Sequence, residues 1–344
     1  MKSIMFLLII VFSSFGCKDN PKLKRHQTSG SRSHTNINNN SQEVTVDKAL
    51  KWLDNLDVNP ITLRKEMGIK GKKKFVELIS IYMVLFQNTK NEKQRRKYKN
   101  IVSKLCKISK DLVYHDLNKI SDKQFTEDST SYLRAWYVMK ELGLDTEYYK
   151  KQIFKIIPRL KTNLAARGTS QKIIFFFYFT ELGLPPETTV EKIFEESMIR
   201  AKLKPEEYTY SEGYTLTHEI FNLYYNNALQ ILHPEDLRYL KEIIPLLVTK
   251  YIYDDDIDLL AEFITAMTYL KMIDINEYDL AVNYLLSSQN ENGSFGKYEN
   301  LRSRYLEIGI DIEYQRYLHT TSVSVKALAI AGKNRETVAK ENSK

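Results

Sequence analysis

Apolar residues recur at the 3.6-residue spacing of an α-helix along most of the chain from residue 44 onward. No stretch shows convincing alternation of apolar and polar residues, as a half-buried strand would require. The pattern predicts helices at 44–56, 73–87, 92–117, 131–142, 147–160, 170–182, 190–203, 215–229, 234–249, 256–271, 276–287 and 319–331. We therefore expect an all-α protein.

The ends of several predicted helices indicate an internal repeat. Segments 136–149 and 177–190 both contain the letters ELGL, beginning at Glu141 and Glu181. Segments 266–279 and 325–338 look like further copies of the same helix end. Periods of about 40 residues with two helices each are typical of helical arrays. Such an array is either an open superhelix, which needs polar capping repeats, or a closed barrel.

The last predicted repeat has the most specific pattern. Gln289 begins a Q-x-x-x-G-x-F-G loop that ends at Gly296, and Tyr317 begins a Tyr-x-His-Thr run that contains His319. This order resembles the final repeat of the α/α toroids shared by terpenoid cyclases and protein prenyltransferase β subunits. The resemblance favours closure, and it implies an α/α toroid, a barrel of about six helical hairpins, over residues 44–332.

Alternating outer and inner helices would place the N-termini of all inner helices at one end of the barrel. Polar residues that could transfer protons are predicted there, namely Tyr214, His218, Glu219 and His319. A neutral histidine is a poor helix cap, which indicates another role for His218 and His319. In a β-elimination on a uronate, such residues would supply the base while a cation neutralises the carboxylate.

The resemblance also implies a metal hypothesis for the same end of the barrel. In protein prenyltransferases, a D-x-C at the beginning of one inner helix and the histidine of the next bind zinc. Here Asp256 and Asp258 fall at the D-x-C, and His319 matches the histidine, but the cysteine is missing. Two carboxylates and an imidazole could bind a divalent metal, with harder preferences than a site that contains a thiolate. The alternative is that these aspartates only cap a helix. No other cofactor is expected.

The first residues predict export. An apolar run at 5–12 after one lysine is too short to span a membrane and is typical of a signal peptide, here 1–16. The letters SFGC resemble a bacterial lipobox, which implies that Cys17 is acylated and anchors the chain in a lipid bilayer. Because Lys18 directly follows this cysteine, the resemblance implies that the lipid anchor lies in the outer membrane. An ordinary signal peptide is the alternative. Residues 17–43 are expected to be a disordered tether, and 333–344 a polar tail.

Composition narrows the partners. The net charge is +8, with basic clusters at 70–74 and 93–99. Nucleic acid is not an expected partner of an exported lipoprotein, so these clusters indicate a solvated face or contact with anionic lipid or polysaccharide. The 23 tyrosines can stack on sugar rings. Cys106 lies on an apolar helix face and is predicted to be a buried thiol.

These observations predict an outer-membrane lipoprotein whose toroid binds a ligand, such as an acidic carbohydrate, at the N-terminal end of the inner helices. Two alternatives follow: a polysaccharide lyase or hydrolase of the α/α toroid class, and a metal-dependent enzyme distantly like protein prenyltransferases. The sequence contains no G-x-S-x-G, P-loop, Rossmann or H-E-x-x-H motif, so it does not indicate a reaction.

Overall fold

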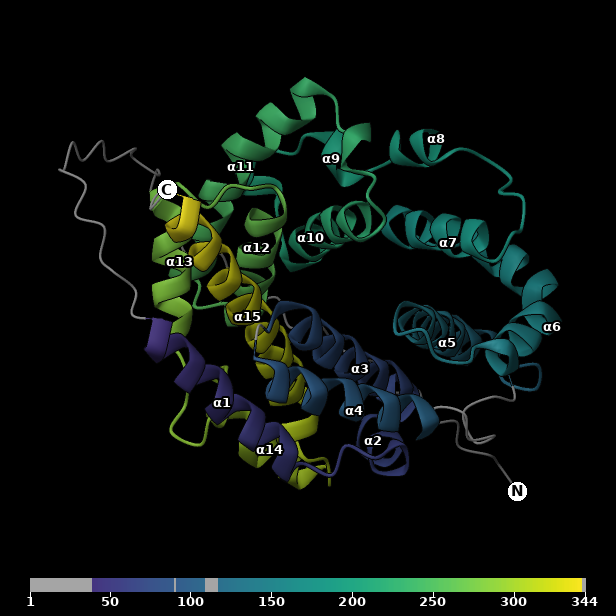
Figure 1. Cartoon of the computed structure of the whole chain (residues 1–344), viewed down its shortest axis with the longest axis horizontal. Helices are drawn as coiled ribbons and strands as arrows, with labels where there is room; N and C mark the ends of the chain where they lie inside the picture. The colour runs from purple at the N-terminus through teal and green to yellow at the C-terminus, as the bar shows by residue number, and fades with distance from the viewer. Residues whose placement is uncertain (1–38, 90, 109–116, 342–344) are drawn as a thin grey trace, which may run out of the picture. The chain divides into compact units, whose positions relative to one another are not determined.

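The computed structural model describes residues 39–89, 91–108 and 117–341, and this part of the chain is all-helical, which confirms the all-α prediction (Figure 1). The predicted signal peptide, Cys17 and nearly all of the predicted tether lie outside the described residues, so the lipid anchor stays a prediction. The helices are α1 (Asn39–Asn55), α2 (Pro60–Met67), α3 (Gly71–Asn88), α4 (Glu92–Ile108), α5 (Asp122–Glu141), α6 (Glu147–Leu164), α7 (Thr169–Glu181), α8 (Val190–Phe194), α9 (Met198–Ala201), α10 (Tyr210–Tyr225), α11 (Pro234–Tyr253), α12 (Ile257–Tyr269), α13 (Asn276–Ser287), α14 (Arg302–Glu307) and α15 (Leu318–Glu341).

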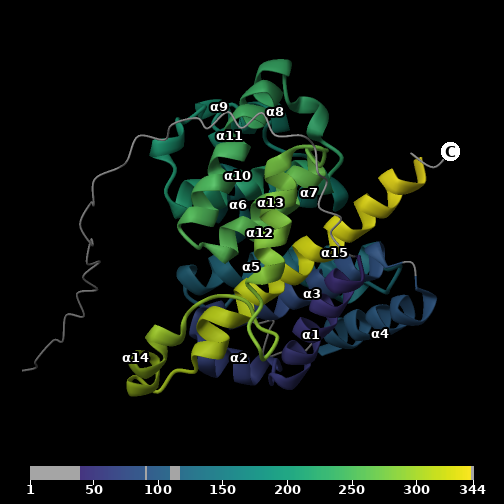
Figure 2. The same ribbon diagram turned by 90° about the vertical axis from the view of Figure 1, so that its left-hand side faces the viewer.

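Six helices form an inner set, which we call the inner helices: α3, α5, α7, α10, α12 and α15. Helix α15 packs against α3 and α12, α3 packs against α5, and α10 packs against α7 and α12 (Figures 1 and 2). Trp136 and Tyr137 of α5 meet the ring of Tyr178 on α7, with ring centroids 6.5 and 5.8 Å apart. Helices α1, α4, α6, α8 and α13 pack outside this set, each against an inner helix.

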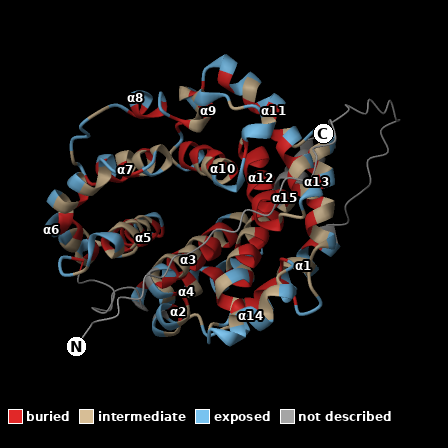
Figure 3. Cartoon of the chain, turned by 180° about the vertical axis from the view of Figure 1, so that it is seen from behind, coloured by how far each residue is buried: buried red, intermediate tan, exposed pale blue. Residues whose placement is uncertain are grey.

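Burial follows the apolar pattern of each helix (Figure 3). Every residue of α12 from Ile257 to Tyr269 is buried, because this helix has neighbours on several sides. The burial includes Asp258, Glu262 and Thr265, which share one face of the helix. Cys106 is fully buried, as predicted. Among the helices described, none is long and apolar enough to cross a membrane.

The repeated helix ends are confirmed in three of the four predicted copies. Gly143, Gly183 and Lys271 all have a positive φ, at 66°, 72° and 57°. The next residue in each case donates its amide five residues back, as in Leu144 N to Met139 O at 3.0 Å, which is the hydrogen bond of a Schellman motif. The fourth copy, at 325–338, is wrong. Helix α15 continues to Glu341 because 333–341 is rich in helix-forming residues and contains no proline or glycine.

Several predicted helix boundaries are also wrong. Helix α5 begins at Asp122, not at 131, because Ser121 caps it by accepting a hydrogen bond from Gln124 N. Helix α10 begins at Tyr210 with Thr209 as its cap, five residues earlier than predicted. The helix predicted at 190–203 is interrupted, because Ser197 caps a new helix, α9. Helices α2 and α14 were not predicted.

The loop from Gln289 to Gly296 joins the first helix to the last. Gln289 Nε2 donates to Thr45 O of α1 at 2.8 Å, and Phe295 N donates to Thr321 Oγ1 of α15 at 2.9 Å. Gly293 has φ 101°, and a Cβ there would lie 2.5 Å from the carbonyl oxygen of Lys48. The glycine is therefore required both by its backbone angle and by the close approach of α1.

Candidate functional site

Two cavities lie among the inner helices and share part of their walls. Cavity A, of about 220 Å³, is lined by residues from all six inner helices, and cavity B, of about 350 Å³, by residues from α3, α5, α7 and α10 and from the turn before α7. Six residues line both cavities: Glu77, Arg134, Ile174, Tyr214, His218 and Asn222. Four of these six carry a charged group or a group that can transfer a proton, so the boundary between the cavities is chemically the richest part of the fold.

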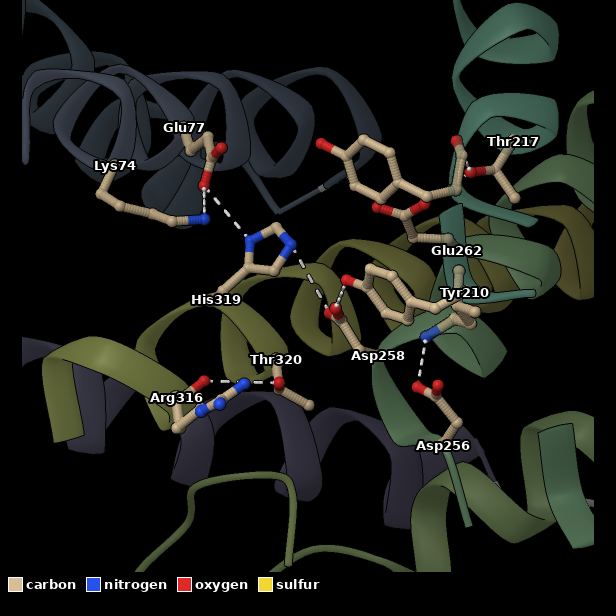
Figure 4. Close-up of polar contacts among 12 residues, drawn as sticks. Lys74, Glu77, Tyr210, Thr217, Asp256, Asp258, Glu262, Arg316, His319 and Thr320 are labelled. Atoms are coloured by element: carbon tan, nitrogen blue, oxygen red, sulfur yellow. Dashed lines mark hydrogen bonds and ion pairs between the residues drawn. The ribbon is translucent and has the colours of Figure 1, made fainter. Parts of the chain in front are cut away.

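His319 lies between two carboxylates from different helices (Figure 4). Its Nδ1 is 3.2 Å from Glu77 Oε2, and its Nε2 is 3.6 Å from Asp258 Oδ1. Burial lowers the pKa of His319, but Asp258 and Glu77 more than offset this and raise it above its usual value. Burial likewise raises the pKa of Glu77, while Lys74, at 2.7 Å, and His319 hold it well below its usual range. The imidazolium and the Glu77 carboxylate therefore stabilise each other.

Tyr210 completes the group around Asp258. Its hydroxyl donates to Asp258 Oδ2 at 2.6 Å, and burial together with this carboxylate raises the pKa of the phenol. Tyr210 is the first residue of α10, and Asp258 belongs to the first turn of α12. The hydrogen bond therefore ties the N-termini of two inner helices together.

His218 forms the second histidine site, one turn after Tyr214 on α10. Its Nδ1 lies 2.9 Å from the backbone oxygen of Tyr214 and 3.5 Å from Glu262 Oε2. A carbonyl oxygen only accepts hydrogen bonds, so Nδ1 carries a proton. Among the described residues Nε2 has no hydrogen-bond partner, which leaves it available to a ligand in either cavity. This is the tautomer that a general base requires.

Glu262 and Tyr214 define the surroundings of His218. Burial raises the pKa of Glu262, but His218 and the hydrogen bond from Thr217 Oγ1 at 2.5 Å lower it below its usual value. Tyr214 stacks on the imidazole, with ring centroids 3.8 Å apart. Burial and the nearby Glu262 raise the pKa of Tyr214 well above its usual value, so its phenol stays protonated and can donate.

Arg134 and Lys326 place two cations in the wall of cavity A. Within the described part of the chain, neither Arg134 nor Lys326 forms an ion pair, although both line the cavity. Lys326 Nζ lies 4.0 Å from the ring centroid of Phe221 and 5.5 Å from that of Tyr225. Burial lowers the pKa of Arg134, but Tyr178 and Glu77 raise it above its usual value, so the guanidinium is charged. Arg134 and Lys326 thus offer positive charge to a ligand, beside the carboxylates of Glu77, Glu141 and Glu262 that also line cavity A.

Residues 46–329 match the model of a protein family described as a domain of unknown function, DUF6895. The chain belongs to the DUF6895 family. No curated protein and no solved structure matches the chain. The resemblance to terpenoid cyclases and protein prenyltransferases therefore stays a prediction from the residues.

The DUF6895 domain brings three of the four predicted catalytic residues to the cavities. Tyr214, His218 and His319 line cavity A. Glu219 does not, because its carboxylate accepts hydrogen bonds from Met198 N and Ile199 N, at 3.0 and 3.2 Å, at the beginning of α9. Burial raises the pKa of Glu219 to about 7, but the group lines neither cavity.

The predicted metal site is not assembled. Of the three residues proposed for it, His319 and Asp258 face each other, whereas Asp256 accepts a hydrogen bond from Leu259 N at 3.1 Å and caps α12. Burial raises the pKa of Asp256 to about 6. Across the described residues, no group of three or more His, Cys, Asp or Glu side chains could hold a metal ion. The capping alternative for Asp256 is therefore confirmed.

Sequence reasoning missed four residues of the site: Glu77, Arg134, Glu262 and Lys326. A signal was present for three of them, because Glu262 is the single charge in the letters LLAEFITAM, Arg134 in SYLRAWYVM and Lys326 in SVSVKALAIAG. A lone charge in an apolar helix needs a buried partner or a ligand. Glu77 had no such signal, since it follows a run of lysines that reads as a solvated helix start.

Proposed function

We propose that the DUF6895 domain is an α/α toroid whose central cavities bind an acidic ligand, and that this ligand is an acidic carbohydrate. The closed arrangement is supported by the packing order of the inner helices and by their joint contribution to cavity A. The contacts of the Gln289 loop with both α1 and α15 support it further.

Among the described residues, neither Arg134 nor Lys326 forms an ion pair, although Glu77 acts on Arg134, and this is the observation that carries the proposal. A charge inside a protein is costly unless an opposite charge or several hydrogen bonds compensate for it. The two carboxylates closest to the histidines, Glu77 and Glu262, are already engaged by Lys74, His319 and His218. A carboxylate of the ligand would complete the pairing of Arg134, for which the planar guanidinium is well suited.

The remaining walls of cavity A suit a sugar ring. Tyr137, Tyr178 and Tyr214 line it, and Ser80 and Asn222 add hydrogen-bonding groups. Tyrosine combines a flat apolar face with a hydroxyl, so it can stack on the C–H face of a sugar and also bond to its hydroxyls. An acidic sugar therefore matches both the charge and the surface of the cavity.

A second candidate function is β-elimination on the same ligand, and the free Nε2 of His218 favours it. In this reaction His218 Nε2 takes the proton on the carbon next to the carboxylate, and the bond to the leaving sugar oxygen breaks. The protonated phenol of Tyr214 gives its proton to that oxygen. Arg134 stabilises the negative charge that develops on the carboxylate.

Calorimetric titration with digalacturonate tests the proposal. We expect the wild type to bind it and to bind its uncharged dimethyl ester far more weakly. Arg134→Met should weaken binding of the acid by about tenfold or more, because a hydrogen bond to a charged group contributes about 1.5–3 kcal/mol. Arg304→Met, at an exposed position of α14, is the matched control and should bind as the wild type does.

The opposite result is equally clear. Equal affinity for acid and ester, or an Arg134→Met variant that binds as the wild type does, contradicts the proposal.

Ultraviolet absorbance of the same mixtures separates the two candidate functions. Elimination produces an unsaturated uronate that absorbs, and His218→Gln should abolish this signal while digalacturonate still binds.

A further inference from the structure

We infer that the ligand is a chain of at least two acidic units that occupies cavities A and B at once, with the bond between the two units beside His218. This inference rests on the proposed function, and it names the length and charge of the ligand.

The residues that line both cavities show that the two cavities adjoin each other. Arg134, Tyr214 and His218 line both cavities, so the cavities meet at these side chains. The residues of cavity B include Lys73 near the beginning of α3 and Thr169 and Ser170 at the beginning of α7. Those of cavity A include residues near the helix ends, such as Gln87 of α3 and Tyr225 of α10. The two cavities therefore follow one another along the inner helices, as successive units of a chain ligand would.

Each cavity has cations of its own in addition to the shared Arg134. Lys326 lines cavity A only, and Lys73 and Arg167 line cavity B only. None of these three forms an ion pair with a carboxylate of the described residues. Glu127 and Glu141 also lie in the walls, and carboxylates act on two of these cations without forming an ion pair, Glu127 on Arg167 and Glu77 on Lys73. A ligand with one anionic group in each cavity would therefore find a cation in both.

Arg167 shows how cavity B is prepared for an anion. The side chain is only 5 % exposed, and its hydrogen bonds go to neutral groups, such as Asn163 Oδ1 at 2.8 Å and Ser129 Oγ at 3.0 Å. Burial lowers the pKa of Arg167 to about 10, so the group is still charged at neutral pH. A buried charge that is held by neutral partners leaves a positive field in the adjoining cavity.

The beginning of α7 adds to this field. Gly168 is its N-cap, and the residues from Gly168 to Gln171 line cavity B. The helix dipole places partial positive charge at this end, where the first amide groups have no acceptor within the helix. Together with Lys73 and Arg167, it makes cavity B a site for the second anionic group.

The boundary between the cavities then holds the bond that joins the two units. His218 Nε2 and the Tyr214 phenol lie there, and Arg134 is placed to pair with the carboxylate of the unit beside them. A single acidic sugar would fill only one cavity and leave the cations of the other without an anion. We therefore expect affinity to rise steeply between one unit and two.

Calorimetry with galacturonate, digalacturonate and trigalacturonate tests this inference. The wild type should bind one digalacturonate per chain, at least about tenfold more tightly than galacturonate. Lys326→Met and Lys73→Met each remove one cation and keep most of the side-chain length, and each should remove most of this gain. Arg304→Met should retain it. Circular dichroism and thermal unfolding establish that each variant is folded.

Four results would overturn the inference. If galacturonate binds as tightly as digalacturonate, or if only one of the two lysine variants reduces the gain, the ligand occupies a single cavity, and the proposed function stands without the inference. If two digalacturonate molecules bind per chain, the cavities are separate sites. If none of the three acids binds, both the inference and the proposed function fail.

Discussion

At the scale of single residues, the two histidines contact carboxylates that are distant in the sequence. His319 contacts Glu77 across 242 positions, and His218 contacts Glu262 on a neighbouring inner helix. Both histidines could be selected from the sequence, because histidine is an unusual residue at a helix start. Their partners could not, since the packing of α3 and α12 against α15 decides which side chains meet.

The Glu77–His319–Asp258 group predicts a dependence of stability on pH. The pKa of His319 is raised in the folded state, so its stabilising effect is fully present below the ordinary histidine pKa and is lost as the pH rises through the raised value. We expect the free energy of unfolding of the wild type to fall, relative to that of His319→Gln, as the pH rises above the ordinary histidine pKa of about 6.5. The variant should be less stable by about 1–3 kcal/mol below this pH.

Urea unfolding at several pH values measures this effect. Glu77→Gln is the informative companion, because it leaves His319 with only Asp258 as a charged partner. Its pH dependence should lie between those of the wild type and of His319→Gln. If the wild type and His319→Gln lose stability in parallel as the pH rises, the imidazolium does not contribute as described.

At the scale of helices and loops, the Gln289–Gly296 loop connects the first helix, α1, to the last helix, α15, by hydrogen bonds. Its glycines were singled out from the sequence by their resemblance to a toroid repeat, and their local role follows from geometry. Gly293 combines a φ of 101° with a close approach to Lys48 O, whereas Gly143 has a φ of 66° and no neighbour that a Cβ would meet.

This contrast gives a matched pair of substitutions. Gly143→Ala should cost about 1–2 kcal/mol, the strain of a left-handed alanine. Gly293→Ala should cost more, because the added Cβ must also displace the backbone of α1. Denaturant unfolding gives both values, and hydrogen exchange should show faster exchange in α1 for Gly293→Ala alone. Equal costs for the two variants would mean that the contact with Lys48 does not constrain the loop.

Helix boundaries limited what the sequence could reveal about the site. The first two turns of α5 and the first turn of α10 are polar, so the sequence pattern predicted loops there. For α10, the spacing of Thr209 and Glu212 is that of a capping box and could have located the helix start. His218 consequently lies in the third turn of its helix, inside the cavity wall, and not at the mouth. The helix ends at the ELGL segments could be predicted better than these helix starts. The residue with a positive φ and the hydrogen bond that follows it depend only on neighbouring residues in the sequence.

At the scale of the molecule, the all-helical class and the alternation of inner and outer helices could be predicted from periodicity and from the 40-residue repeat. The cavities could not, because their volume and charge depend on side chains from six helices at once. Glu219 and Asp256 illustrate the difference. Both looked like site residues in the sequence, and both cap a helix in the structure.

The central claim is that a cavity among the inner helices binds an acidic ligand, and a crystal structure of the described domain with trigalacturonate tests it most directly. The account predicts a closed ring of inner helices with density for the ligand beside Arg134 and His218, and carboxylates directed toward Lys326 and Lys73. Density for trigalacturonate only on the outer surface would contradict it, as would inner helices packed together with no cavity between them.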